Sequence, residues 1–278
     1  MNYHFDPFIV EYSPSITPIF DFKTECTMAV NKALSKNTNN LPIIVMMSGG
    51  IDSQLVAESL LLADISFKCV IGRLQGKIEN NISIFNKHDF EYAERWCSSN
   101  NIDIVYCDID IFKQEKLLME YALLSNGFSP QYACHMYIMK WCADNGYFFL
   151  AGNGEMDIIL YNNEYHMMDE QREFTLDNFC KLNNIPGVFQ FWKQDGRLIS
   201  AFLQLPTVKT LMGKRVERLL DYKHKCFLDV FQFEDRCKNT GFETIQHWDS
   251  ILRNYLKKYT GQYDQKFYTP ISHFQNKG

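Results

Sequence analysis

A short glycine-containing turn, Ser48-Gly49-Gly50-Ile51-Asp52-Ser53, carries the residues of this 278-residue chain that are best suited to chemistry. Glycines let backbone N–H groups approach an anion without an intervening Cβ, and the positive end of a following helix adds to the attraction. The hydroxyls of Ser48 and Ser53 can donate hydrogen bonds to the same oxygens. A carboxylate at Asp52 would repel phosphates unless a divalent cation lay between them. The turn therefore predicts a phosphate site with magnesium.

The same turn fits a plainer interpretation, in which two glycines join a strand to a helix and Asp52 is an acid in the first helical turn. Two common phosphate loops are excluded, because neither GxxxxGK[ST] nor GxGxxG follows this strand. The chain is predicted to be neither a Walker-type nucleotidase nor a simple dinucleotide-binding protein.

Apolar runs and amphipathic helices alternate on both sides of the turn. The run at 43–47 is short and continuously apolar, which is typical of a strand buried on both faces of a parallel sheet. A helix is expected from Asp52 onward. Further strands are expected at 67–74, 102–107 and 147–151, and further helices at 23–35, 89–100, 113–125 and 131–144. This alternation predicts a parallel α/β sheet with helices on both faces, in which ligands bind beyond the carboxyl ends of the strands.

The sequence SGGIDS at the end of the first expected strand resembles the PP-loop of the ATP pyrophosphatases. This superfamily of Rossmann-like α/β proteins includes asparagine synthetase, GMP synthetase, NAD synthetase and tRNA-modifying enzymes. The resemblance implies that ATP and magnesium are bound, that a substrate oxygen attacks the alpha phosphate and that pyrophosphate leaves. A nucleophile then displaces AMP. It implies a catalytic and magnesium-binding role for Asp52, and nucleotide binding by Met47, Ser48, Gly49, Gly50, Ile51, Asp52, Ser53, Ile71, Gly72 and Gly152.

A second segment, 148–157, has an apolar run followed by a Gly-x-Gly turn with acids. It resembles the SGEGADE stretch of the asparagine synthetase domain, about one hundred residues after the PP-loop, and Asp89-x-x-Tyr92-Ala93 is similar to a DE-x-x-A helix of that domain. Asn153 and Met156 stand where the family has acids. Asp157 is the expected second magnesium ligand, and Glu155 is expected to face the substrate or the metal. The alternative is a strand-end turn whose acids cap the next helix.

Basic residues late in the chain could neutralise a departing pyrophosphate. The family places a lysine shortly before a glycine and an aromatic residue, and Lys238 is the best match, with Arg236 nearby. A cation placed against oxygens that gain charge in the transition state is the most useful help for phosphoryl chemistry. Both residues could equally be solvated. Lys214 and Arg218, on an expected helix at 208–221, are interpreted as part of a solvated face.

Composition excludes several classes of protein. Hydrophobic residues make up 46% of the chain and charged residues 22%, which is typical of a folded globular protein. The net charge of -5 gives no general reason to expect nucleic-acid binding. Nine scattered cysteines without CxxC predict reduced, buried thiols in a cytoplasmic protein. Neither a membrane span nor a signal peptide is expected.

The overall prediction is a Rossmann-like, PP-loop α/β domain at 41–165, after an N-terminal extension at 1–40 and before a mainly helical region at 166–278. The favoured function is an AMP- and pyrophosphate-forming ligase that adenylates a carboxylate or carbonyl oxygen for attack by ammonia or an amine. The forty residues before the turn are too few for a glutaminase domain, so ammonia from a separate glutaminase or a carrier partner is compatible. A homodimer is plausible for the superfamily. Modification of tRNA or a nucleotide, and nucleotide binding without catalysis, are the alternatives.

Overall fold

A six-stranded sheet forms the centre of the computed structural model, which describes residues 21–78, 81–125, 129–153, 156–170, 174–193, 196–233, 241, 245–260 and 266–274. The strand order is β3-β2-β1-β5-β8, with β4 also paired to β2, and every pairing is parallel except that of β3 with β2. The strands are β1 (Ile43–Met46), β2 (Lys68–Ile78), β3 (Asn81–Ile84), β4 (Ile104–Asp110), β5 (Phe148–Leu150) and β8 (Gly187–Val188).

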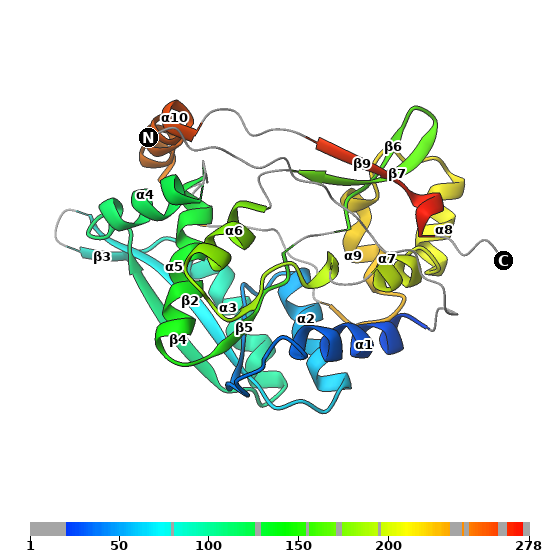
Figure 1. The fold of residues 1–278 in the computed structure, drawn as a ribbon, viewed down its shortest axis with the longest axis horizontal. Helices are drawn as coiled ribbons and strands as arrows, with labels where there is room; N and C mark the ends of the chain where they lie inside the picture. Colours follow the sequence, from blue (N-terminus) through cyan, green and yellow to red (C-terminus); the bar gives the residue numbers. More distant parts are fainter. Residues whose placement is uncertain are drawn as a thin grey trace.

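Helices cover both faces of this sheet (Figure 1). Successive residues of one strand enter different cores: Val45 belongs to one hydrophobic cluster and Ile44 to another, and both are fully buried. This double burial explains the continuous apolar run in the sequence. The first cluster includes residues of α1 (Phe22–Leu34), α2 (Ile51–Leu62), α3 (Lys87–Ser99) and α7 (Gly196–Phe202), and the second those of α4 (Glu115–Leu124), α5 (Pro130–Asp144), α6 (Phe174–Leu182) and α10 (Gln246–Thr260).

The order of the strands reverses at β1. The chain leaves β1 through α2 and pairs β2 on one side, whereas β5 returns to pair with β1 on its other side. In a parallel sheet such a reversal separates the loops at the carboxyl ends of the two central strands and leaves a crevice. The turn Ser48–Ser53 follows β1, so the fold places it at this switch point.

A second, three-stranded sheet was not predicted. It has the order β6-β7-β9, all antiparallel, with β6 (Ile158–Tyr161), β7 (Glu164–Glu170) and β9 (Lys266–Pro270). A two-residue turn joins β6 to β7, and Asn162 and Asn163 both have positive φ, 50° and 66°. Figure 1 shows this sheet away from the central one, beside α8 (Pro206–Gly213) and α9 (Lys223–Phe227).

The expected helix at 208–221 is wrong beyond Gly213. Helix α8 ends there, Arg215 has a left-handed φ of 57°, and Arg218 is extended before a short 3-10 helix at Leu219–Tyr222. Lys214 and Arg218 therefore do not share a helical face. The other expected elements exist with ends shifted by a few residues, and the region after 165 is mainly helical as predicted.

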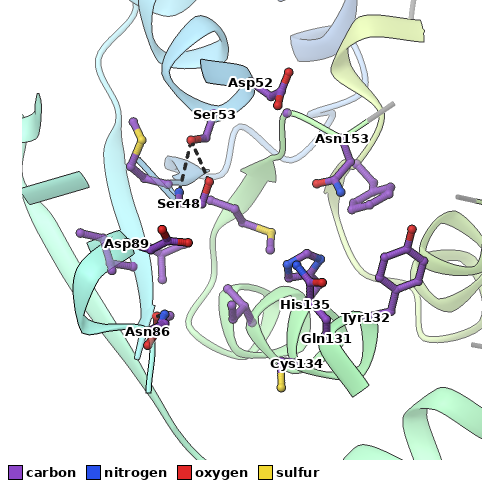
Figure 2. A pocket seen from close by; sticks show the side chains of 18 of the residues that line it. Ser48, Asp52, Ser53, Asn86, Asp89, Gln131, Tyr132, Cys134, His135 and Asn153 are labelled. Carbon is purple, nitrogen blue, oxygen red and sulfur yellow. Dashed lines mark hydrogen bonds between the residues drawn. The ribbon is translucent and has the colours of Figure 1, made fainter. Parts of the chain in front are cut away.

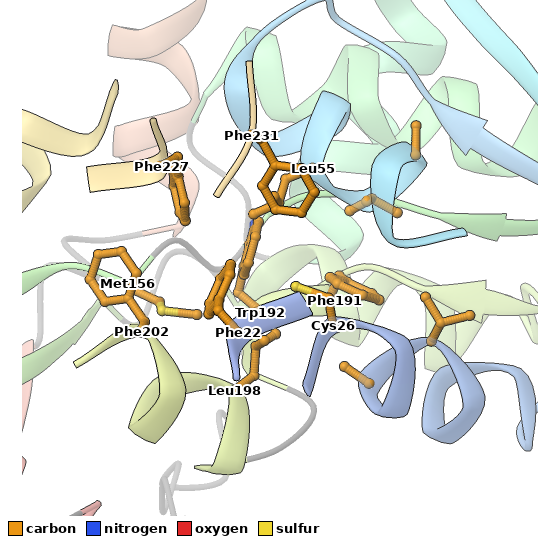
Figure 3. Close-up of a cluster of buried hydrophobic side chains, with 14 of the residues drawn as sticks. Phe22, Cys26, Leu55, Met156, Phe191, Trp192, Leu198, Phe202, Phe227 and Phe231 are labelled. Carbon is orange, nitrogen blue, oxygen red and sulfur yellow. The ribbon is translucent and has the colours of Figure 1, made fainter. Parts of the chain in front are cut away.

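Packing crosses both predicted domain boundaries. In Figure 3, Phe22 of α1 lies against Trp192 of the 3-10 helix Phe191–Lys193, with ring centroids 6.4 Å apart. Glu25, 1% exposed, accepts two hydrogen bonds from Arg197 of α7, at 2.6 and 2.9 Å. These contacts join the first described helix to the region after 165. The domain division itself remains a prediction.

Eight cysteines of the described residues are free thiols and buried, as the scattered spacing predicted; Cys237 lies outside those residues. Burial raises the pKa of Cys26, Cys107 and Cys180 to about 12. The thiolate is the reactive form, so these thiols are chemically quiet. In the described part of the chain, no helix combines the length and apolarity that a bilayer crossing requires.

Glu58 on α2 gives a pH-dependent prediction. Burial raises its pKa, although a hydrogen bond from Trp96 partly opposes the shift. A raised carboxyl pKa means that the folded state penalises the charged form, so the penalty is absent below the unfolded pKa and complete above the folded one. Glu58→Gln is therefore expected to raise the melting temperature at pH 7.5 and to change it little near pH 4. Glu120→Gln, at an exposed position of α4, controls for the loss of one charge. Equal effects of Glu58→Gln at both pH values would contradict the assignment.

Candidate active site

The turn after β1 is held in one conformation by its own side chains. The Oγ of Ser53 donates to the carbonyl of Gly50 at 2.9 Å, accepts from the N–H of Ser48 at 3.2 Å and lies 3.2 Å from the Oγ of Ser48. Gln54 donates from its amide to the carbonyl of Gly49 at 2.7 Å. The loop thus needs little rearrangement to present its polar groups.

Two glycines are required by close packing around this turn. Gly49 has φ +72°, and a Cβ there would lie 2.6 Å from the backbone nitrogen of Ala93 in α3. A Cβ on Gly152, which follows β5, would lie 2.4 Å from the carbonyl oxygen of Asp52. The turn is therefore wedged between α3 and the end of β5. The Asp89-x-x-Tyr92-Ala93 segment noted in the sequence is the helix against which Gly49 packs.

Asp52 carries an ion pair from a distant part of the chain. Its Oδ2 accepts a hydrogen bond from the Nζ of Lys223 at 2.6 Å, and the two side chains are 22% and 19% exposed. Lys223 begins α9, 171 residues later in the sequence. A cation of this chain therefore lies directly beside the carboxylate at the start of α2.

Asp157 is held by Arg218 in a two-pronged ion pair. The Nε and one terminal nitrogen of Arg218 donate to the two Asp157 oxygens at 2.8 and 2.6 Å. Asp157 is 9% exposed and Arg218 42%, and the pairing raises the pKa of Arg218. Bidentate geometry of this kind is strong and fixes both partners. The sequence interpretation of Arg218 as part of a solvated helix face is therefore wrong.

A cavity of about 310 Å³ lies at the switch point and brings these groups together. Ser48, Asp52 and Ser53 form one wall, and α5 supplies Gln131 and His135 on the facing wall (Figure 2). Its volume is within the range of small-molecule sites. Asp157, Arg218 and Glu170 line it as well.

The strand β2 supplies an apolar side of the cavity, through Val70, Ile71, Gly72 and Leu74. The side chain of Asn86 bonds to the backbone of β2. Its amide nitrogen donates to the carbonyl of Gly72 and its amide oxygen accepts from the N–H of Leu74, both at 2.8 Å. The backbone of β2 is thereby fixed where it borders the cavity. Its apolar side chains suit contact with a planar, weakly polar group.

The structure brings together most of the predicted nucleotide-binding residues. Met47, Ser48, Ser53, Ile71, Gly72 and Gly152 line the cavity with Asp52, whereas Gly49, Gly50 and Ile51 form the turn behind it. Asn153 lines the cavity, and Met156 is 5% exposed within the hydrophobic core. Three predicted catalytic residues, Glu155, Arg236 and Lys238, lie outside the described residues.

The described carboxylates support one protein ligand for magnesium, Asp52, better than two. Magnesium in phosphate sites is commonly held by one or two carboxylates together with substrate phosphates, so a complete protein cage is not needed. Among the described residues no cluster of three metal-binding side chains occurs. Asp52 lies in the turn after β1 and lines the cavity; its Oδ2 is bonded to Lys223, so it suits that role when this bond rearranges. Both Asp157 oxygens are bonded to Arg218, so its metal role requires this pair to open and stays a prediction.

Sequence reasoning missed Lys223, Gln131 and His135 as cavity residues or partners of the turn. Gln131 and His135 are four residues apart on α5 and so share one helix face, a signal the sequence offered. Lys223 offered none, because only the fold brings it to Asp52.

The fold and the cavity define a doubly wound α/β protein with a ligand-sized cleft at its switch point. Neither a protein-family model nor a curated protein matches the chain. Solved structures to which it is similar include NMN synthetase from Francisella tularensis, with 15% identity, TM-score 0.35 and coverage of 87% of this chain and 97% of that one.

Two further neighbours are NAD synthetases. The NH3-dependent enzyme from Campylobacter jejuni has 15% identity, TM-score 0.32 and coverage of 88% and 98%. The glutamine-dependent enzyme from Acinetobacter baumannii, in complex with ADP, has 15% identity, TM-score 0.34 and coverage of 94% of this chain and 49% of that one. Structural similarity this remote does not establish a function. The function of this chain is therefore inferred from its own residues.

Proposed function

We propose that the chain is an ATP-dependent ligase that forms AMP and pyrophosphate, and that the Ser48–Ser53 turn binds the phosphates. The observation that carries this proposal is the placement of the SGGIDS turn. It follows β1 at the switch point, opens α2 and lines the cavity with Ser48, Asp52 and Ser53. A helix N-terminus beyond the carboxyl end of a central strand is a favourable anion site.

The base of ATP is proposed to lie against β2. Val70, Ile71, Leu74 and Ile138 give this part of the cavity an apolar surface, and the backbone at Gly72 comes close to it without a side chain. The triphosphate would then run toward the turn, where the Ser48 and Ser53 hydroxyls and the α2 N-terminus lie. The predicted roles of Met47, Ile71, Gly72 and Gly152 fit this orientation.

The reaction proposed is adenylation followed by amide formation. A substrate carboxylate oxygen attacks the alpha phosphorus, the bond from that phosphorus to the bridging oxygen breaks, and pyrophosphate leaves with the electron pair. Ammonia or an amine then attacks the acyl carbon, loses a proton, and AMP leaves. Magnesium, when bound, supplies charge neutralisation at the phosphates. The chain's own task is to hold the reactants together and exclude water from the acyl adenylate.

Lys223 is proposed to act on the charge that develops on pyrophosphate. Its Nζ lies at the first turn of α2 through its bond to Asp52, and Lys223 lines a small pocket beside the cavity together with Asp52. A cation close to the developing charge is worth most in a site screened from water. Lys238 and Arg236 keep the same role as predictions. Ammonia could come from solution or from a separate glutaminase or carrier protein.

The test is pyrophosphate exchange into ATP with magnesium and a panel of carboxylic acids. We expect exchange with at least one acid, and Asp52→Asn is expected to lower it about a hundredfold or more, because the variant loses the charge that suits magnesium. Asp64→Asn, in the turn after α2, removes a comparable charge outside the cavity and serves as control. Unchanged exchange in Asp52→Asn would remove its proposed role.

One observation favours a second candidate, nucleotide binding without turnover. Asp52 and Asp157 are both engaged by cations of the chain, and Met156 places a core side chain where the resembled family has an acid. The two candidates separate in one experiment. ATP binding without AMP or pyrophosphate across the whole acid panel would favour the non-catalytic one.

A further inference from the structure

The three-stranded sheet has one face in the core and one face directed outward. Strand alternation and the pairing register put Tyr161, His166, Tyr268 and Glu170 on the same face. The opposite face carries Ile158, Met167 and Asp169, all fully buried. The first face also carries Met168, which pairs with Tyr268 and is 5% exposed. Its exposed part lies at Tyr161 and Tyr268, and this part is available for contacts with a ligand.

Three rings on this face form an ordered group, which we call the ring platform: Tyr161, His166 and Tyr268. The two tyrosine rings are stacked, with centroids 4.5 Å apart and planes 8° from parallel. His166 meets both edge-on, at 5.8 and 6.4 Å. Tyr161 is 43% exposed and Tyr268 37%. Aromatic groups fixed in this way offer a rigid stacking surface at little entropic cost.

The strand register places two cavity residues next to residues of the ring platform. Glu170, which lines the cavity, is paired with Lys266, so Tyr268 is its diagonal neighbour at roughly 7–8 Å on the same face. On the other edge, Ile159 pairs with His166 and also bridges to Arg218, another cavity residue. Two cavity residues, Glu170 and Arg218, therefore lie on strands or bridges that adjoin the residues of the ring platform.

The charges around the ring platform favour a small ligand over a polyanion. Lys266 is ion-paired to Glu170 at 3.7 Å, and Glu164 lies on the same face opposite Tyr161. Arg215 is exposed and bonds to Asn163 at the hairpin turn. This mixture of signs, with a net charge of -5 for the chain, lacks the dense row of cations that a nucleic-acid backbone requires.

We propose that the ring platform is the outer part of the substrate site, and that the carboxylate substrate carries a planar aromatic ring about 7 Å or more from its carboxylate, the reach set by the diagonal spacing of strand neighbours. The ring stacks on Tyr268 while the carboxylate lies in the cavity near Arg218. This inference rests on the proposed function for the identity of the reactive group. The stacking surface itself can be tested without catalysis.

The test compares direct binding of indole-3-butyrate with that of cyclohexanebutyrate, by ligand-observed NMR and calorimetry on the full chain without ATP. Indole-3-butyrate is expected to bind about tenfold more tightly than the saturated acid. Tyr268→Ala is expected to weaken it about tenfold, a typical loss for a stacked aromatic pair. Tyr268→Phe should restore most of the affinity. Tyr255→Ala, at a 42% exposed tyrosine of α10, controls for loss of a surface ring.

Equal affinity for both acids, or no effect of Tyr268→Ala in a variant with an unchanged melting temperature, would overturn the proposal. A third result would also overturn it: a single-stranded oligonucleotide binds in a way that depends on Tyr268, and ring-bearing acids do not bind. The ring platform would then be a nucleic-acid site. Pyrophosphate exchange is measured in parallel. Tyr268-dependent acid binding without exchange would support the stacking surface and count against the ligase chemistry, so the two failures are distinguishable.

Discussion

Lys223→Met is expected to lower the turnover number for pyrophosphate formation about a hundred- to a thousandfold, the loss typical of removing one preorganised stabiliser of transition-state charge. The Nζ of Lys223 is 2.6 Å from the Asp52 carboxylate at the start of α2, which places its charge beside the Ser48–Ser53 turn, the proposed phosphate site. The KM for ATP should change much less, because the charge develops as pyrophosphate leaves. Steady-state kinetics with ammonia and a carboxylic acid found active in the exchange assay measures both quantities.

The control for this prediction lies two residues away. Lys225 is exposed on the same helix, with its Nζ 5.8 Å from the ring of Tyr222, and Lys225→Met should leave the turnover number nearly unchanged. The double variant Asp52→Asn/Lys223→Met should lose less than the product of the two single losses, because the residues are in contact. Similar losses in Lys223→Met and Lys225→Met would show that Lys223 has no special role.

Lys193→Met is expected to lower the free energy of unfolding by about 3–5 kcal/mol, because it leaves the carboxylate of Asp169 buried without its cation. Lys193 forms a salt bridge with Asp169, and the two side chains are 5% and 0% exposed. The pair joins β7 to the 3-10 helix at Phe191–Lys193, beside the cavity residue Glu170. Urea unfolding followed by circular dichroism gives the value directly.

Two matched variants identify the cause of this loss. Asp169→Leu/Lys193→Met removes both charges and should recover a large part of the stability, since an apolar pair of similar volume is often no worse than a buried ion pair. Lys181→Met breaks an exposed pair with Asp177, in which the side chains are 71% and 42% exposed, and should cost less than about 1 kcal/mol. A loss in Lys193→Met as small as that in Lys181→Met would contradict the buried-charge explanation.

The central sheet could be predicted because the signal for a strand lies in the strand's own residues. Ile44 and Val45 are consecutive buried apolar residues that face different cores, and this double burial produces a strand signal without alternation. The turn at the glycines after β1 and the start of the helix at Ile51 could be predicted for the same reason, because both depend on residues that are close in the sequence. The β6–β7 hairpin had its own local signal, Asn162-Asn163 directly after the apolar run 158–161, because asparagine tolerates positive φ.

The partners of the site could not be predicted, because they depend on contacts over long sequence distances. Asp157 and Arg218 are 61 residues apart, and Asp52 and Lys223 are 171 apart. The apolar periodicity after Pro206 indicated a helix long enough to include Arg218, but Gly213 and the left-handed Arg215 end it. Arg218 is extended instead, beside β6, and its side chain reaches Asp157.

The cleavage position in ATP tests the central claim most directly. Purified protein would be incubated with magnesium, ATP labelled at the alpha phosphate, an acid that supports exchange and ammonia, and the labelled products separated. Cleavage at the Ser48–Ser53 turn as proposed gives labelled AMP, with an equal amount of pyrophosphate and loss of both in Asp52→Asn. Labelled ADP with free orthophosphate as the product would contradict it.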